Sequence, residues 1–352
     1  MAGVLNIPKL PRVSPLTFRK QSKPPSISIS ASSETSDPQP DTVSISTKEV
    51  QNSSFASSSS SSTAAAAAAA VSFAPPPNFK PPEPKRFGIR PDKIWDIIGA
   101  CLALFFRLGT GIFVSGYSAS LVSKDEIPPD QYSLEIGGYK LKETSKIGPR
   151  PEKPIEIYEF ESCPFCRKVR EIVSILDLDV LFYPCPKNGP TFRPKVTEMG
   201  GKQQFPYMVD PNTGVAMYES DAIIKYLVRN YGDGRVPFML SLGPLTTLTE
   251  AFAMISRLGK GTYYTPSKLP PEPLEIWSFE GSPFCKIARE VLVELELPHI
   301  QRSCPRGSPK RNILLEKAGH FQVPYLEDPN TGVQMFESAE IVDYLRATYA
   351  QY

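Results

Sequence analysis

A long internal repeat constrains the fold of this chain more than any other feature. The tetrapeptide Cys-Pro-Phe-Cys begins at Cys163, and Ser-Pro-Phe-Cys begins 119 positions later at Ser282. The stretch Asp-Pro-Asn-Thr-Gly-Val also occurs twice, at residues 210–215 and 328–333. Two copies of one small domain are therefore expected, and the first copy alone carries the two motif thiols that a disulfide needs.

Length and charge narrow the function classes. A chain of 352 residues can hold two or three domains, and each copy of the repeat is large enough for one small core. Because 39 lysines and arginines nearly balance 37 aspartates and glutamates, there is no basic field and no nucleic-acid partner is expected. Six cysteines are too few for a disulfide scaffold, so Cys-x-x-Cys beside a strand–helix pattern predicts redox chemistry in a reducing compartment.

The first 75 residues differ in composition from the rest. Serine is abundant, residues 57–62 and 64–70 are homopolymer tracts, and residues 1–33 contain lysine and arginine but no acidic residue. This composition is typical of an organelle transit peptide. We expect residues 1–75 to be a disordered transit region for the chloroplast, with the stroma favoured over thylakoid or envelope association. A mitochondrial destination and an untargeted tail are the alternatives.

Residues 76–153 are expected to hold a Pro-rich linker, an apolar helix at about 94–117 and an insertion. The apolar segment Ile94–Tyr117 is near the length of a membrane span, but Asp96 and Arg107 interrupt it. The short sequence that starts at Arg107 recurs, nearly unchanged, at Arg257. The segment that precedes this second occurrence is too polar to span a bilayer. We therefore favour two equivalent helices that pack beside their domains over membrane association.

Each copy predicts the element order strand, helix, strand, helix, strand, strand, helix. Short apolar runs bounded by proline predict buried strands, apolar positions at helical spacing predict one-sided helices, and Pro-Asn-Thr-Gly predicts a hairpin turn. In the first copy the elements are expected at 155–160, 164–176, 180–183, 192–200, 206–209, 215–218 and 220–231. In the second they are expected at 274–279, 283–296, 299–303, 308–318, 324–336 (the hairpin) and 338–349.

This order, with Cys-Pro-Phe-Cys at the start of the first helix, resembles the thioredoxin fold. It is most similar to glutaredoxins and to the N-terminal domain of glutathione transferases. The expected fold is α/β, with two tandem thioredoxin-like (βαβαββα) domains, each preceded by a helix. The domains are expected at 154–231 and 272–352, with a linker and helix at 232–271. Taken whole, the chain resembles plant plastid proteins with two transferase-N-terminal modules.

The resemblance implies a plastid glutathione-linked thiol–disulfide oxidoreductase of glutaredoxin type. The first domain would be the active one, and the second would be a degenerate module that binds glutathione or protein. The implied partners are glutathione, as co-substrate, and protein disulfides. The alternatives are a non-catalytic binding or scaffold protein and a glutathione-dependent isomerase or transferase-like protein.

Cys163 is the candidate catalytic nucleophile. At a helix cap, unpaired N–H groups and the helix dipole favour a thiolate, which is the reactive form. Arg167 and Lys168 would add positive potential. Cys166 lies on the same helix face and can resolve a mixed disulfide. Structural cysteines or half of a metal site are the alternatives, but no second pair of ligands is evident and no metal is expected.

Ser282 removes two-thiol exchange from the second copy, because a hydroxyl cannot form a disulfide. One interpretation is that Ser282 only caps a helix at a retired site. The other comes from similarity to the catalytic-serine motif of tau-class plant glutathione transferases, which implies a hydrogen bond to a bound glutathione thiolate.

The resemblance also implies further glutathione contacts in each copy. It assigns a cis-proline, the residue before it, and a Glu-Ser pair at the start of the last helix, where free N–H groups would meet the γ-glutamyl carboxylate. Lys187 and Arg306 are weaker candidates for the glycyl carboxylate. The residues assigned in this way are Phe205, Pro206, Glu219 and Ser220 in the first copy, and Val323, Pro324, Glu337 and Ser338 in the second.

Cys185 and Cys304 each end the second strand of their copy. In a parallel sheet the ends of the first two strands share one edge, so Cys185 is expected on the side that carries Cys163. It would be a second resolving thiol, an iron–sulfur ligand or a packed core residue. We favour packing, and an iron–sulfur cluster is not the favoured cofactor.

Overall fold

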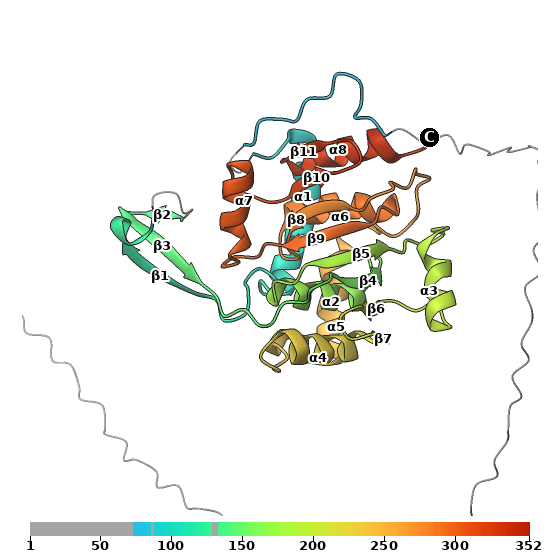
Figure 1. Ribbon diagram of the computed structural model, residues 1–352, viewed down its shortest axis with the longest axis horizontal. Helices are drawn as coiled ribbons and strands as arrows, with labels where there is room; N and C mark the ends of the chain where they lie inside the picture. Colours follow the sequence, from blue (N-terminus) through green and yellow to red (C-terminus); the bar gives the residue numbers. More distant parts are fainter. Residues whose placement is uncertain (1–72, 86–87, 129–132) are drawn as a thin grey trace, which may run out of the picture. The chain divides into compact units, whose positions relative to one another are not determined.

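The computed structural model describes residues 73–85, 88–128 and 133–352. Nearly all of the proposed transit region lies outside the described residues. The fold class predicted from the sequence is confirmed, because two thioredoxin-like βαβαββα modules follow each other along the chain (Figure 1).

The two modules contain the same seven elements. The first consists of β4 (Ile155–Glu159), α2 (Pro164–Ile175), β5 (Val180–Pro184), α3 (Phe192–Gly200), β6 (Tyr207–Asp210), β7 (Val215–Met217) and α4 (Ser220–Tyr231). The second consists of β8 (Leu274–Ser278), α6 (Pro283–Glu294), β9 (His299–Ser303), α7 (Lys310–Ala318), β10 (Tyr325–Asp328), β11 (Val333–Met335) and α8 (Ser338–Tyr349).

The strands of both modules form one sheet of eight, in the order β11-β10-β8-β9-β5-β4-β6-β7. Each module contributes a parallel pair, β4 with β5 and β8 with β9. The modules meet where β5 and β9 pair antiparallel, with Leu181 opposite Ile300 at the centre of the register. These two residues occupy equivalent positions in the repeat, so the pairing relates the two modules by an approximate two-fold axis.

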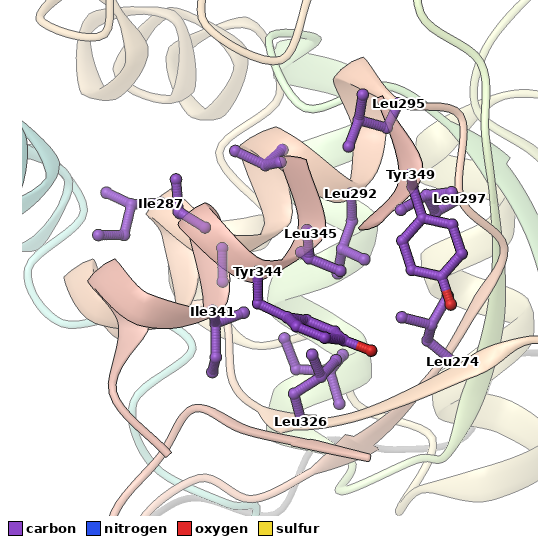
Figure 2. Close-up of a cluster of buried hydrophobic side chains, with 14 of the residues drawn as sticks. Leu274, Ile287, Leu292, Leu295, Leu297, Leu326, Ile341, Tyr344, Leu345 and Tyr349 are labelled. Atoms are coloured by element: carbon purple, nitrogen blue, oxygen red, sulfur yellow. The ribbon is translucent and has the colours of Figure 1, made fainter. Parts of the chain in front are cut away.

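Each module has its own apolar core between sheet and helices. Figure 2 shows the second core, where Leu274 of β8, Leu292 of α6, Leu326 of β10 and Leu345 of α8 meet. In the first module the inward face of α2 is built as predicted, except that Phe165 is 47% exposed. Phe165 is the second residue of the helix, in its first turn.

Two helices outside the modules cover this helical layer. They are α1 (Ile94–Phe106), which packs on α6, and α5 (Pro244–Ile255), which packs on α2. The expectation that each helix packs beside the domain that follows it is therefore wrong, because each lies on the other module. Helix α1 is also shorter than expected, because Gly109 and Gly111 adopt positive φ angles after Arg107. Among the residues that the structure describes, no helix has the length and apolarity that a bilayer crossing needs.

The insertion before the first module forms a separate small sheet. Its strands are β1 (Ser118–Ser123), β2 (Glu135–Ile136) and β3 (Tyr139–Thr144), paired antiparallel in the order β1-β3-β2. Three short 3₁₀ helices, η1 (Pro91–Lys93), η2 (Lys124–Glu126) and η3 (Phe238–Leu240), complete the described elements.

A buried network of ion pairs joins the two modules. Glu161, two residues before Cys163, contacts Lys286 of α6 at 2.7 Å. Its counterpart Glu280 contacts Arg167 and Arg170 of α2 at 2.7 and 2.9 Å. Both carboxylates are almost fully buried, so each module neutralises cations of the other.

Candidate functional site

The motif cysteines lie where β4 passes into α2. Cys163 caps the helix, and its Sγ accepts a hydrogen bond of 3.3 Å from the backbone N–H of Cys166. Hydrogen bonds from Cys166 lower the pKa of Cys163, against the opposing effect of burial. Burial raises the pKa of Cys166 well above its usual range. The pair thus has the asymmetry expected of a nucleophile and a resolving thiol.

Access to Cys163 is narrow, because the residue is only 5% exposed. The loop after α5 lies against it, where the Thr262 hydroxyl donates a hydrogen bond of 2.6 Å to the hydroxyl of Ser162. The peptide bond before Pro206 is cis, as the resemblance implied.

Arg193 of α3 was missed by the sequence analysis. Its guanidinium lies 4.7 Å from the ring centre of Phe205, and its Nε donates hydrogen bonds to the carbonyls of Cys185 and Pro186 at 3.0 and 2.6 Å. Its pKa is lowered by burial, partly offset by the electrostatic effect of the neighbouring thiols of Cys185, Cys166 and Cys163. Arg193 therefore places a cation beside the motif.

The charges of Arg167 and Lys168 are engaged elsewhere. Arg167 pairs with Glu280 of the other module, and Lys168 pairs with Asp221. The positive potential expected from these residues is therefore largely neutralised.

Cys185 and Cys304 are fully buried, and burial raises the pKa of each, that of Cys304 to about 12. Each packs within an apolar cluster under the site of its module. Their surroundings are those of packed core residues, which is the interpretation that the sequence analysis favoured for both cysteines. Within the described part of the chain, no group of three or more His, Cys, Asp or Glu side chains is placed to hold a metal ion.

The Glu-Ser pairs stand at the start of the last helix of each module, where the resemblance put them. Glu219 and Glu337 both adopt positive φ, 68° and 71°, which is uncommon for a residue with a side chain. The amide of Gln204 donates a hydrogen bond of 2.6 Å to Glu219. Ser220 and Ser338, the first residues of α4 and α8, are nearly buried.

The second module contains a cavity of about 260 Å³ that joins the residues assigned to it from the sequence. Ser282 is the N-cap of α6, and its Oγ accepts a hydrogen bond of 3.2 Å from the N–H of Cys285. The peptide bond before Pro324 is cis, as expected. The assigned residues that line the cavity are Ser282, Val323, Pro324, Glu337 and Ser338.

Two arginines line this cavity. Arg311 of α7 is held by hydrogen bonds from its guanidinium to the carbonyls of Cys304 and Phe321, at 2.7 and 2.6 Å. Arg306 also lines the cavity and pairs with Glu143 of β3. Arg311 was not foreseen, although an arginine follows the strand cysteine in both copies, seven or eight positions on.

Part of the cavity wall comes from a segment expected to be only a linker. Lys85 and Gly88 line the cavity, and the backbone N–H of Lys85 donates a hydrogen bond of 2.7 Å to Glu337. The Phe79 ring, 5.0 Å from that of Tyr344, packs this segment against α8. Leu104 and Ile112, from α1 and the loop after it, add an apolar wall.

Comparison with family models agrees with the repeated architecture. The model of the glutathione S-transferase N-terminal domain matches residues 157–237 and 277–352. Among solved structures, a glutathione transferase of Bombyx mori is 33% identical over 24% of this chain and 38% of its own, with a TM-score of 0.22. The same protein in complex with GTT matches with equal identity and TM-score, over 24% of this chain and 39% of its own.

The chain thus spans well under half the length of these transferases. A search of curated proteins gives no match. Two segments of the chain therefore match the glutathione S-transferase N-terminal domain, and each lies in a module with a thioredoxin-like fold.

Proposed function

We propose that this protein is a glutathione-linked thiol–disulfide oxidoreductase in which the second module binds glutathione and the first carries the redox thiols. One observation carries the proposal: the five residues assigned to glutathione in the second copy line a single cavity. Its volume of about 260 Å³ lies just below the usual range for small-molecule sites, about 300–1,000 Å³. A tripeptide is a ligand of suitable size.

The charges of the cavity complement glutathione, which has two carboxylates and one ammonium group. The N-terminus of α8 at Ser338 offers unpaired N–H groups to the γ-glutamyl carboxylate. Arg311, whose hydrogen bonds go to carbonyl oxygens, favours the negative charge of the peptide as a whole, whereas the charge of Arg306 is paired with Glu143. By the same resemblance, the backbone of Val323, which lines the cavity, would bind the cysteinyl part.

The Ser282→Ala variant tests this assignment. If the hydroxyl bonds the glutathione sulfur, its loss weakens glutathione binding about tenfold or more, because hydrogen bonds to charged groups contribute about 1.5–3 kcal/mol. Binding of S-methylglutathione, whose sulfur carries no charge, should change much less. Equal affinity of the variant and the wild type for glutathione in calorimetry would remove Ser282 from the site.

In the first module we propose two-step thiol–disulfide exchange. The Cys163 thiolate attacks one sulfur of a substrate disulfide, forming a mixed disulfide and releasing the other sulfur as a thiolate that takes a proton from solvent. Cys166 then loses its proton and attacks the Cys163 sulfur, which releases the second substrate thiol. The substrate gains two electrons and the Cys163–Cys166 pair is oxidised. Two molecules of glutathione would reduce it again and leave as glutathione disulfide.

A disulfide-reduction assay checks this step. The Cys163→Ser variant should lose activity, and the Cys166→Ser variant should accumulate the mixed disulfide. Cys101→Ser is the matched control, because Cys101 lies in α1, outside both modules. Full activity of the Cys163→Ser protein would remove Cys163 as the nucleophile. A wild type without activity would leave a binding or scaffold role, which the 5% exposure of Cys163 also favours.

A transferase-like reaction is the second candidate function. It is favoured by the apolar side chains of Leu104, Ile112 and Phe284, which share the cavity with Ser282 and offer surface to an apolar electrophile. Conjugation of glutathione to chlorodinitrobenzene measures it directly. Turnover that disappears in Ser282→Ala but persists in Cys163→Ser would assign transfer to the second module.

We also propose import into the chloroplast, on the basic, serine-rich and acid-poor composition of residues 1–33. A fluorescent protein fused after residue 75 should enter plastids, and a fusion that lacks residues 1–75 should not. Equal distribution of the two fusions would leave the segment as an untargeted tail.

A further inference from the structure

Helices α1 and α5 expose two matching rows of apolar side chains. Each row contains five large residues that are 40–91% exposed, and every residue of the first row has its counterpart 150 positions later. We call the ten side chains together the α1/α5 face. They are Trp95, Ile98, Leu102, Phe105 and Leu108 in the first row and Leu245, Leu248, Phe252, Ile255 and Leu258 in the second.

The two rows lie side by side because the helices pack antiparallel. The hydroxyl of Ser256, after the end of α5, donates a hydrogen bond of 2.6 Å to the carbonyl of Gly99 in α1. Arg107, after the end of α1, donates one of 2.6 Å to Thr249 of α5. The rings of Phe106 and Phe252 lie 5.7 Å apart between the helices. The ten side chains therefore belong to one surface.

The polarity of these helices is the reverse of that of an ordinary surface helix. Their charged groups face inward, where Arg107 contacts Glu250 at 3.1 Å and Arg257 contacts Glu290 at 2.7 Å. These ion pairs are buried. The outward α1/α5 face contains no charged member, so water is its least favourable environment.

The face is large enough for a stable interface. With aromatic side chains of about 150–250 Å² and somewhat smaller leucines and isoleucines, its exposed area is on the order of 1,000 Å². The largest apolar patch on a typical monomer is about 300–600 Å², and one partner of a standard interface contributes about 800 Å². The α1/α5 face is therefore larger than the largest apolar patch of a typical monomer, and it is large enough for one side of a standard interface.

The ends of the two rows show the same backbone strain. Leu108 and Leu258 adopt φ angles of 48° and 49°, in the left-handed region that leucine rarely enters, and they are 77% and 91% exposed. The turns that follow α1 and α5 thus each hold a leucine outward at the same strained position. Such strain persists where the position has a function.

We propose that the α1/α5 face binds the same face of a second copy of this chain. An isologous dimer needs a self-complementary surface, and the two matched antiparallel rows supply one. Two such faces would stack as four helices around a shared apolar core. The cations at its edge are already engaged, since Lys260 and Arg257 both pair with Asp96, which disfavours attraction to an anionic lipid surface.

Sedimentation velocity of the full chain over a concentration series tests the proposal. The wild type should form dimers. The double variant Phe105→Glu/Ile255→Glu should be monomeric, with the dissociation constant raised more than about a hundredfold, because each carboxylate would be buried without a partner. Leu121→Glu/Ile313→Glu is the matched control: these residues are 57% and 52% exposed on β1 and α7, and this variant should remain dimeric.

Three outcomes would overturn the proposal: a wild type that stays monomeric, a Phe105→Glu/Ile255→Glu variant that still dimerises, or a control that dissociates. Flotation with neutral phosphatidylcholine vesicles tests for lipid as the other occupant of the face. If the wild type is monomeric and floats with the vesicles, and the Phe105→Glu/Ile255→Glu variant does not, the face binds lipid. If the Phe105→Glu/Ile255→Glu variant does not fold, a photo-crosslinking residue in place of Phe105 provides an independent test. It should give covalent dimers, and the same residue at Leu121 should not; absence of dimers at Phe105 counts against the proposal.

Discussion

Cys163 and Ser282 occupy the same backbone position in the two modules, with φ −91° and ψ 119° in both. Each caps its helix by accepting a hydrogen bond from the N–H three residues on. One atom therefore separates the chemistry of the two sites. A sulfur here can become a thiolate nucleophile, whereas an oxygen can only hydrogen-bond.

The pKa of Cys163 gives a prediction at this scale. It is lowered chiefly by the hydrogen bond from Cys166, while burial raises the pKa of Cys101, Cys166, Cys185, Cys285 and Cys304. When the native protein is titrated from low to high pH, thiolate absorbance should therefore first rise by the amount for a single thiol. This step should lie at a pH below the pKa of an ordinary cysteine. The Cys166→Ala variant should move this step to higher pH, because it removes the hydrogen bond from the Cys166 thiol and keeps only the one from the backbone N–H.

The Cys163→Ser variant is the control, since the early step should vanish with the sulfur. An unchanged titration in Cys166→Ala would mean that the neighbouring thiol does not tune Cys163.

The residues that sequence reasoning found at the site are those with a local signature. Ser282, Pro324, Glu337 and Ser338 belong to motifs, and the structure brings them to one cavity. Arg311 and Lys85 have no such signature. They reach the cavity through helix α7 and through a segment nearly two hundred positions before Ser282, contacts that only tertiary packing creates.

Among the elements, the seam between β5 and β9 joins the modules. His299 begins β9, pairs with Phe182 of β5, and its ring lies 5.6 Å from the phenylalanine ring. Burial lowers the pKa of His299 to about 4. Between pH 4 and about 6.5 the unfolded chain thus binds the proton that the folded chain excludes, and stability falls as the pH falls through this window.

This linkage predicts a loss from His299 of about 3 kcal/mol in the free energy of unfolding between pH 6.5 and 4, since one pKa unit is worth about 1.4 kcal/mol. The His299→Gln variant should lose less stability than the wild type over the same range. Urea unfolding at a series of pH values measures the difference. His320→Gln, at an exposed position, is the control, and an equal acid slope in all three proteins would contradict the assignment.

The elements within each module could be predicted almost to the residue, because proline, turn sequences and apolar spacing mark their limits. Helices α3, α4 and α8 and strand β9 have the predicted bounds. The pairing of β5 with β9 could not be predicted. Each of these strands lies at the edge of its own module, and its sequence does not indicate which strand it pairs with there. The packing of α1 on α6 and of α5 on α2 could not be predicted either, because Arg107 and Arg257 after these helices pair with Glu171 and Glu290 of the module next in the chain and do not indicate it.

For the whole molecule, the buried ion pairs predict that the two modules unfold together. Glu161 contacts Lys286 and Arg289 of the second module, and all three are nearly inaccessible. The Glu161→Gln variant should lose about 3–5 kcal/mol of stability, because it leaves buried cations without their partner. Calorimetry should still show a single transition for both modules.

The variant Glu152→Gln is the control, because Glu152 is exposed and outside the network. Two separate transitions in Glu161→Gln, with the second module unchanged, would mean that the modules are energetically independent.

Calorimetric titration with reduced glutathione tests most directly whether the second module binds glutathione while the first carries the redox thiols. The account predicts saturable binding of glutathione at one site per chain, retained in the Cys163→Ser variant and weakened about tenfold or more in Ser282→Ala. No binding to the wild type, or binding that disappears in Cys163→Ser and persists unchanged in Ser282→Ala, would contradict it.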